Sequence, residues 1–165
     1  MNLQEAAAQA QAYAEAGDER AIADLRRKWE DELEGAARHT DYRFRAVAYR
    51  AIGQFRFRQK LELLHRGLED ESPACRGSAL VSLELLSRDG PGPVNQTRRV
   101  LHDMASGDDN EAVRRLAIVC LKNGSPQRET IMLLGGLAEN DEESKELRET
   151  ARKVAAQLTK KSRER

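Results

Sequence analysis

The sequence lacks the features that mark a membrane-spanning, secreted or generally nucleic-acid-binding protein. No stretch of about 18 apolar residues occurs in its 165 residues, so no membrane helix is expected. The first residues contain no basic region followed by an apolar run, and we therefore expect a cytoplasmic protein. The 28 basic and 28 acidic residues cancel, and only 4% of residues are aromatic, which disfavours nucleic acid as the partner.

Cysteine and histidine are also scarce, and their spacing indicates no chemistry. Cys75 and Cys120 each occupy a position that the helical pattern makes apolar, so we interpret both as core residues rather than disulfide partners. His39, His65 and His102 show no metal-ligand spacing, and the sequence has neither a glycine-rich phosphate loop nor a serine elbow. We therefore expect no metal, no cofactor and no catalytic residue.

What the sequence does contain is a pattern that recurs four times, here called the arginine code. An arginine follows an apolar residue, an alanine lies three positions after the arginine, and an aliphatic or small residue lies seven after it. These offsets place the residues on one side of a helix. The arginines are 31, 38 and 34 residues apart, a period typical of stacked helical hairpins. The four copies, which define the coded helices, are Phe44-Arg45-Ala48-Ile52, Cys75-Arg76-Ala79-Leu83, Val113-Arg114-Ala117-Leu121 and Leu147-Arg148-Ala151-Ala155.

This period predicts an all-α protein, a right-handed α-solenoid of about four hairpins behind an N-terminal capping helix at 3–16. We expect a single domain over residues 1–158, a surface loop at 87–93 and a frayed basic tail at 159–165. Gly135 and Gly136 fall inside a predicted helix, where each costs roughly 1 kcal/mol relative to alanine, so a kink or a close helix approach is expected there. The predicted hairpins pair 19–38 with a helix beginning near 42, 57–68 with 74–86, 95–106 with 112–121, and 126–139 with 143–158.

The stretches 70–83 and 108–121 resemble the second helix of HEAT repeats, particularly the short bacterial phycobilisome-lyase-like type, and the resemblance spans about residues 20–158. In that family an aspartate in the turn and an arginine early in the second helix form a ladder between neighbouring repeats. The resemblance therefore implies a structural ladder role for the coded arginines, with altered acceptors at the two ends. The matching residues are Asp70 with Arg76 and Asp108 with Arg114, whereas His39 stands six positions before Arg45 and Glu142 six before Arg148.

A basic strip is the sharpest candidate for a binding site. Residues 42–67 carry seven basic side chains and one acidic one, and second helices of such repeats line a concave surface. The strip could grip an acidic protein surface or a phosphate-bearing ligand; alternatively it is a solvated face balanced by acids such as Glu84. Its members, which vary between the copies of the code, are Arg43, Tyr49, Arg50, Gln54, Arg115 and Lys122.

Repetition without reactive residues favours a non-catalytic scaffold or adaptor that binds another protein through its concave face or loops. An assembly factor or an immunity-type inhibitor would fit this description. The alternative is an accessory enzyme subunit or a nucleic-acid-acting HEAT-like protein that uses the basic strip, and it predicts binding that weakens steeply with salt. The sequence leaves the oligomeric state open.

Overall fold

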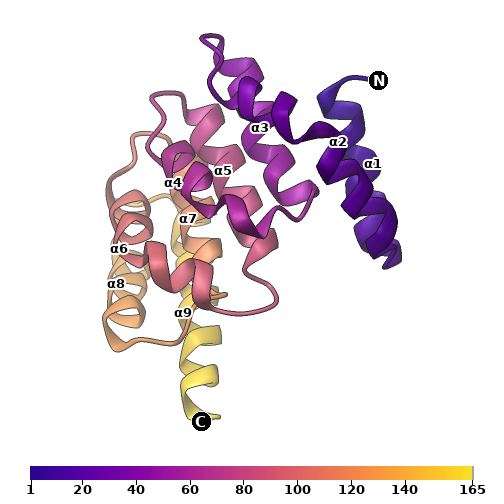
Figure 1. Cartoon of the computed structure of the whole chain (residues 1–165). Coiled ribbons are helices and arrows are strands. Elements are labelled where there is room, and N and C mark those ends of the chain that lie inside the picture. The colour runs from indigo at the N-terminus through magenta and orange to yellow at the C-terminus, as the bar shows by residue number, and fades with distance from the viewer. Residues whose placement is uncertain (165) are drawn as a thin grey trace. The chain divides into compact units, whose positions relative to one another are not determined.

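The computed structural model describes residues 1–164 and confirms the all-α class: within this range it contains nine α-helices, one short 3₁₀ helix and no strand (Figure 1). Most helices begin at a polar N-cap whose side chain accepts a backbone N–H, as Asn2 and Asp18 do for the first two. The elements are α1 (Leu3–Ala16), α2 (Glu19–Ala37), α3 (Tyr42–Gln54), η1 (Arg58–Lys60), α4 (Leu61–Leu68), α5 (Pro73–Leu86), α6 (Gly92–Gly107), α7 (Glu111–Leu121), α8 (Arg128–Glu139) and α9 (Lys145–Arg163).

The chain forms two compact units, Met1–Leu86 and a second that begins at Ser87. The boundary falls at the first residue of the insertion 87–93, where proline and glycine interrupt the helical pattern. The single domain predicted for residues 1–158 spans this boundary and stays a prediction.

In the first unit, α1 packs against α2 and α3, α4 packs against α5, and α3 packs against α5. Gly17 ends α1 in the left-handed conformation with φ 75°, and its N–H bonds the carbonyls of Ala14 and Tyr13, so the chain turns directly into α2. The buried aliphatic and aromatic side chains form one core beneath these helices. Its largest fully buried members are Ile22, Leu33, Ile52, Phe55, Phe57, Leu64, Leu80 and Leu83.

The contact between α3 and α5 is unusually close at Gly53. A Cβ atom there would lie 2.7 Å from the Cα of Ser82, so only glycine allows this approach. The Ser82 hydroxyl accepts the Gly53 N–H at 2.9 Å and donates to the Tyr49 carbonyl. Tyr49 and Gly53 thus meet a side chain from the neighbouring helix at the C-terminal end of α3.

In the second unit, α6 packs against α7, α8 against α9, and α7 against α9. Asn110 and Ser144 cap α7 and α9 by accepting backbone N–H groups. The largest fully buried side chains of this unit are Leu101, Ile118, Leu121 and Leu134. Both cysteines are buried and unpaired with each other, Cys75 in the first unit and Cys120 in the second.

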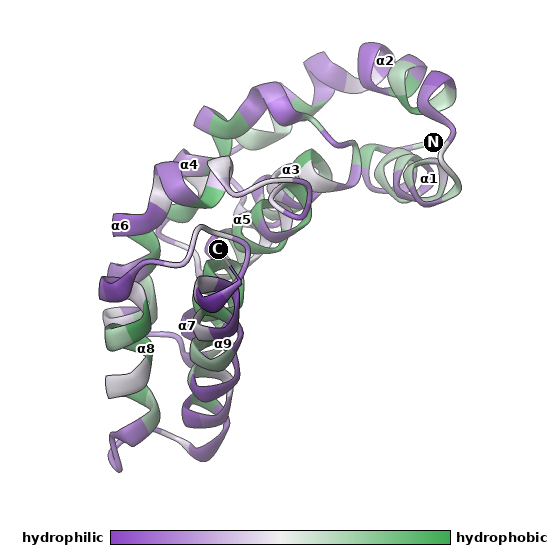
Figure 2. Cartoon of the chain, turned by 90° about the horizontal axis from the view of Figure 1, so that it is seen from below, coloured by the Kyte–Doolittle hydropathy of each residue, from purple (hydrophilic) through white to green (hydrophobic). Residues whose placement is uncertain are grey.

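Residues 159–163 and the two glycines of α8 all lie within helices of the structure. The residues 159–163, predicted to fray, belong to α9, and Lys161 donates to the carbonyls of Lys122 and Gly124 at 3.0 and 3.1 Å; residue 165 lies outside the described residues. Helix α8 continues across Gly135 and Gly136, and no atom lies within 4 Å of a Cβ built at either, so close packing within the chain does not account for them. Hydrophilic colouring predominates along α2 and α9 (Figure 2).

Candidate functional site

The first coded arginine is held by an acid from the following hairpin. Arg45 Nε and Nη2 donate to the two carboxylate oxygens of Asp70 at 2.9 and 3.0 Å, while its Nη1 donates to the carbonyls of His39 and Thr40. Burial by itself would raise the pKa of Asp70, but the hydrogen bonds from Arg45 and from the Ser72 N–H lower it overall. This bidentate pair joins α3 to the turn before α5.

The third coded arginine makes the same kind of pair in the second unit. Arg114 binds both carboxylate oxygens of Glu143, and its Nε donates to the Ala105 carbonyl at 2.9 Å. The side-chain hydrogen bond with Arg114 lowers the pKa of Glu143. Glu143 directly follows Glu142, the residue that stands six positions before Arg148 in the ladder pattern.

Arg76, Arg148 and Asp108 each have contacts within the turn before their own helix. Arg76 donates to the backbone carbonyls of Asp70 and Glu71, not to the Asp70 carboxylate six residues before it. Arg148 lies 3.7 Å from Asp141. The Asp108 carboxylate accepts the Asn110 N–H at 2.9 Å and so shapes the turn that starts α7.

The part of the basic strip in the first unit is not a row of free cations. Arg43 is exposed, but both its Nε and Nη2 donate to the Asp41 carboxylate, and the side-chain hydrogen bond from Arg43 lowers the pKa of Asp41 to about 2. Arg50 is half-buried against α1, where Nη2 lies 3.4 Å from Gln11 Oε1 and the buried Nη1 has no hydrogen-bond partner. Burial lowers the pKa of Arg50.

Tyr49 does not belong to an exposed strip, because its side chain is only 3% exposed between α3 and its neighbours. Gln54, the last residue of α3, is partly exposed. In the second unit, Arg115 lies 3.9 Å from Glu146, and Lys122 is partly exposed just after α7. These residues therefore do not provide a set of unpaired cations within either unit.

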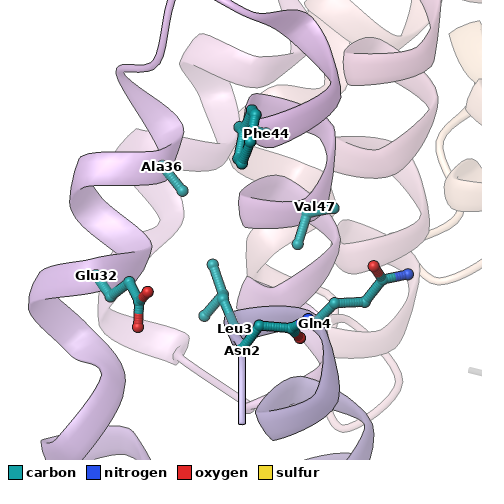
Figure 3. Close-up of a pocket in the computed structure, with 7 residues that line it drawn as sticks. All are labelled: Asn2, Leu3, Gln4, Glu32, Ala36, Phe44 and Val47. Atoms are coloured by element: carbon teal, nitrogen blue, oxygen red, sulfur yellow. The ribbon is translucent and has the colours of Figure 1, made fainter.

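A different feature of the first unit is a hollow between the N-terminus of α1, the second half of α2 and the first half of α3 (Figure 3). Its walls are mainly the apolar side chains of Leu3, Ala36, Phe44 and Val47. The volume is about 190 Å³, larger than an apolar cavity of about 150 Å³ that holds a benzene ring. The hollow, which the sequence did not reveal, is thus large enough for one bulky apolar side chain.

Phe44 differs in exposure from the equivalent residues of the other coded helices. The residue before the arginine is buried in the other three coded helices, where Cys75, Val113 and Leu147 are at most 2% exposed. Phe44 is 52% exposed. Its ring stacks on His39 with a centroid distance of 4.3 Å, and the residue also lines the hollow.

Glu32 is the one charged residue that lines the hollow, and its carboxylate lies toward the open space in Figure 3. Within residues 1–164 it has no ion-pair partner. The nearby cations Arg43 and Arg38 are engaged with Asp41 and Glu34. The uncompensated charge at the hollow is therefore negative.

The second unit contains a buried polar cluster on α6 and α8. Arg98, 8% exposed, donates through Nη1 to the Thr130 hydroxyl at 2.8 Å and through Nη2 to Asn95 and the Ser125 carbonyl. Arg98 can only donate, so the Thr130 hydroxyl oxygen accepts from it, and the same oxygen lies 2.8 Å from His102 Nε2. Burial is the main cause of the lowered pKa of His102. The cluster ties the 122–126 segment to α6.

Other classes of site find no support in the part of the chain that is described. No group of three or more His, Cys, Asp or Glu side chains suited to a metal ion occurs among residues 1–164. Over the same range, no helix has both the length and the apolar character needed to cross a membrane. No family model and no curated protein matches this chain, so the likeness to HEAT repeats remains a prediction.

Proposed function

We propose that the protein is a non-catalytic interaction module, a short right-handed α-solenoid of HEAT-like hairpins, that binds protein through the hollow between α1, α2 and α3. The recurrence of the arginine code supports the solenoid. So do two pairs that each link one hairpin to the next within a unit, Arg45 with Asp70 and Arg114 with Glu143. Solenoids of this kind commonly serve as rigid binding scaffolds.

The exposure of Phe44 carries the proposal. A half-exposed phenylalanine on the rim of an apolar hollow leaves hydrophobic area in contact with water, and covering it would stabilise a complex by about 25 cal/mol per Å². Phe44 occupies a position that is buried in every other copy of the code. The first hairpin therefore presents to solvent a surface that the other coded helices bury.

The basic strip supports this function less well. Arg43 and Arg115 already lie near carboxylates, Arg50 is half-buried, and Tyr49 is buried. An acidic partner or a nucleic acid would have to compete with these contacts. The hollow needs no such rearrangement.

Affinity capture with matched variants tests the proposal. The folded wild-type chain, Phe44→Ala and the surface control Lys153→Ala are immobilised, and proteins retained by the wild type are purified and titrated against all three. We expect Phe44→Ala to weaken binding at least about tenfold, as loss of a central aromatic contact usually does, and Lys153→Ala to leave it unchanged. Binding that ignores Phe44, or salt-sensitive binding of DNA or RNA alone, would replace this proposal with the alternative function.

A further inference from the structure

We infer that the hollow is occupied by helix α8 of a second copy of this chain, with Met132 inserted beside Phe44 and Arg128 paired with Glu32. This inference rests on the proposed function, since it names the partner of the same hollow. The first argument is the distribution of exposed apolar side chains. Among residues 1–164 the large exposed ones are Met1, Tyr42, Phe44 and Met132. Phe44 lines the hollow, and Met1 and Tyr42 are within two residues of lining residues in the sequence. Met132 is the one member of this group on α8.

Met132 is an apolar side chain of the kind that the apolar hollow can accommodate. It is 63% exposed in the middle of α8, and an unbranched methionine adapts to irregular apolar surfaces and favours contact with an aromatic ring. The hollow offers the half-exposed ring of Phe44 together with Leu3 and Val47. Its size suits one such side chain.

The charges at the two surfaces are complementary. Arg128 lies four residues before Met132, hence on the same face of α8, and it is exposed without an ion-pair partner among the described residues. Glu32, equally unpaired, lies at the edge of the hollow. We call the surface formed by Met132 and Arg128 on α8 the knob. Its apolar and basic side chains complement Phe44 and Glu32 of the hollow.

The glycines of α8 are compatible with this contact. Gly136 lies one turn after Met132 and is exposed, and Gly135 also has free space around it. Neither is required for packing within the chain, although each costs about 1 kcal/mol relative to alanine in a helix. Their absent side chains would let a second copy approach α8 closely beside Met132.

The contact uses different surfaces on the two copies, so it is heterologous, and a single contact between two copies leaves one free hollow and one free α8 surface. Wild-type protein should therefore associate with increasing concentration, either into closed rings of two or more copies or into open chains. The contact is small, and interfaces of this size are weak, so association should appear at roughly 0.1–1 mM.

Two variants that each lack one half of the contact give the decisive test in sedimentation velocity at 1 mM chain. Phe44→Asp destroys the hollow and keeps the knob, while Met132→Asp destroys the knob and keeps the hollow; both positions are exposed, and circular dichroism checks their folding. Each variant alone should stay monomeric, and an equimolar mixture should form a dimer and nothing larger. A monomeric mixture, or a wild type that stays monomeric at this concentration, overturns the inference.

A charge exchange separates this contact from general stickiness. Glu32→Arg and Arg128→Glu should each abolish association, and the double variant should restore it, whereas Lys153→Glu on α9 should have no effect. Association that persists in both single variants overturns the pairing. If no self-association occurs but a different protein binds in a Phe44-dependent manner, the inference fails and the proposed function stands; if neither occurs, both fail.

Discussion

Arg45 of the first coded helix donates to both carboxylate oxygens of Asp70, and the two side chains are only 12% and 8% exposed. Arg45 also donates to the carbonyls of His39 and Thr40 in the turn before its own helix, so one guanidinium joins that turn to the turn before α5. A largely buried bidentate pair is costly to break, because either partner alone is left as an unpaired charge.

We expect Asp70→Asn to lower the free energy of unfolding by about 2 kcal/mol, since the guanidinium of Arg45 keeps its burial and loses its counter-ion. Urea unfolding followed by the fluorescence of Trp29, which lies in the same unit, measures the change. Glu71→Gln is the matched control: Glu71 is 4.0 Å from Arg45 and 92% exposed, so its removal should cost less than about 0.5 kcal/mol. Equal losses in the two variants would refute the role of the pair.

Acid should weaken both units through these carboxylates. The folded pKa values of Asp70 and Glu143 lie below their ordinary values of 3.8 and 4.5, so the stability they contribute is complete above those values and is lost as the pH falls through the lower folded values. The difference in unfolding free energy between wild type and Asp70→Asn should accordingly shrink between pH 5 and pH 2. A difference that does not change with pH would show that the ionised carboxylate is not what matters.

Near neutral pH we expect His102 to set the pH dependence of the second unit. Burial, and to a lesser extent Arg98, lower its pKa below the ordinary 6.5, while Glu129 and Asp103 act in the opposite direction. The neutral ring is thus favoured in the folded state, and stability should be complete above pH 6.5 and fall as the pH drops from there toward the folded pKa.

Thermal melts between pH 7.5 and 5, followed by circular dichroism, test this prediction. His102→Gln should flatten the dependence, at the cost of a lower melting temperature throughout, whereas the exposed His39→Gln should preserve it. A wild type whose stability rises on acidification over this interval would contradict the neutral assignment of His102.

Two glycine-to-alanine changes should have opposite signs. Gly53→Ala puts a Cβ 2.7 Å from the backbone of Ser82, and we expect a loss of about 1–3 kcal/mol because α3 and α5 would have to separate. Gly136→Ala meets open space in the middle of α8 and should stabilise by roughly 0.5–1 kcal/mol. Chemical unfolding of both variants decides the matter; destabilisation by Gly136→Ala would mean that this helix position needs glycine for a reason internal to the chain.

The helices and their buried faces were predictable because they depend on local periodicity. The alanines of the arginine code, Ala48, Ala79, Ala117 and Ala151, are all 0% exposed. Their spacing places them on one helix face whatever the neighbouring helix is. Capping by Asn110 was predictable for the same reason, since an N-cap acts on its own helix.

The candidate site was harder to predict because it depends on which helix lies next to which. Tyr49 and Arg43 belong to the same helix, yet Tyr49 is buried and Arg43 is exposed. The difference arises because α4 and α5 cover the side of α3 that carries Tyr49. Arg114 binds Glu143, whereas the ladder pattern in the sequence singled out the preceding residue, Glu142. Phe44 follows the code in sequence but not in burial, because α1 covers only part of the first hairpin; no pattern within one helix reports such a difference.

The insertion of Ser82 between the Tyr49 carbonyl and the Gly53 N–H has a consequence for cooperativity. An unperturbed α-helix joins these two groups to each other, but here both also bond a hydroxyl that belongs to α5. The last turn of α3 is therefore completed by a residue of the next hairpin, and neither hairpin reaches its final hydrogen bonding alone. The amide proton of Gly53 should exchange with solvent only when α3 and α5 separate, so its exchange rate reports when the first unit opens as a whole.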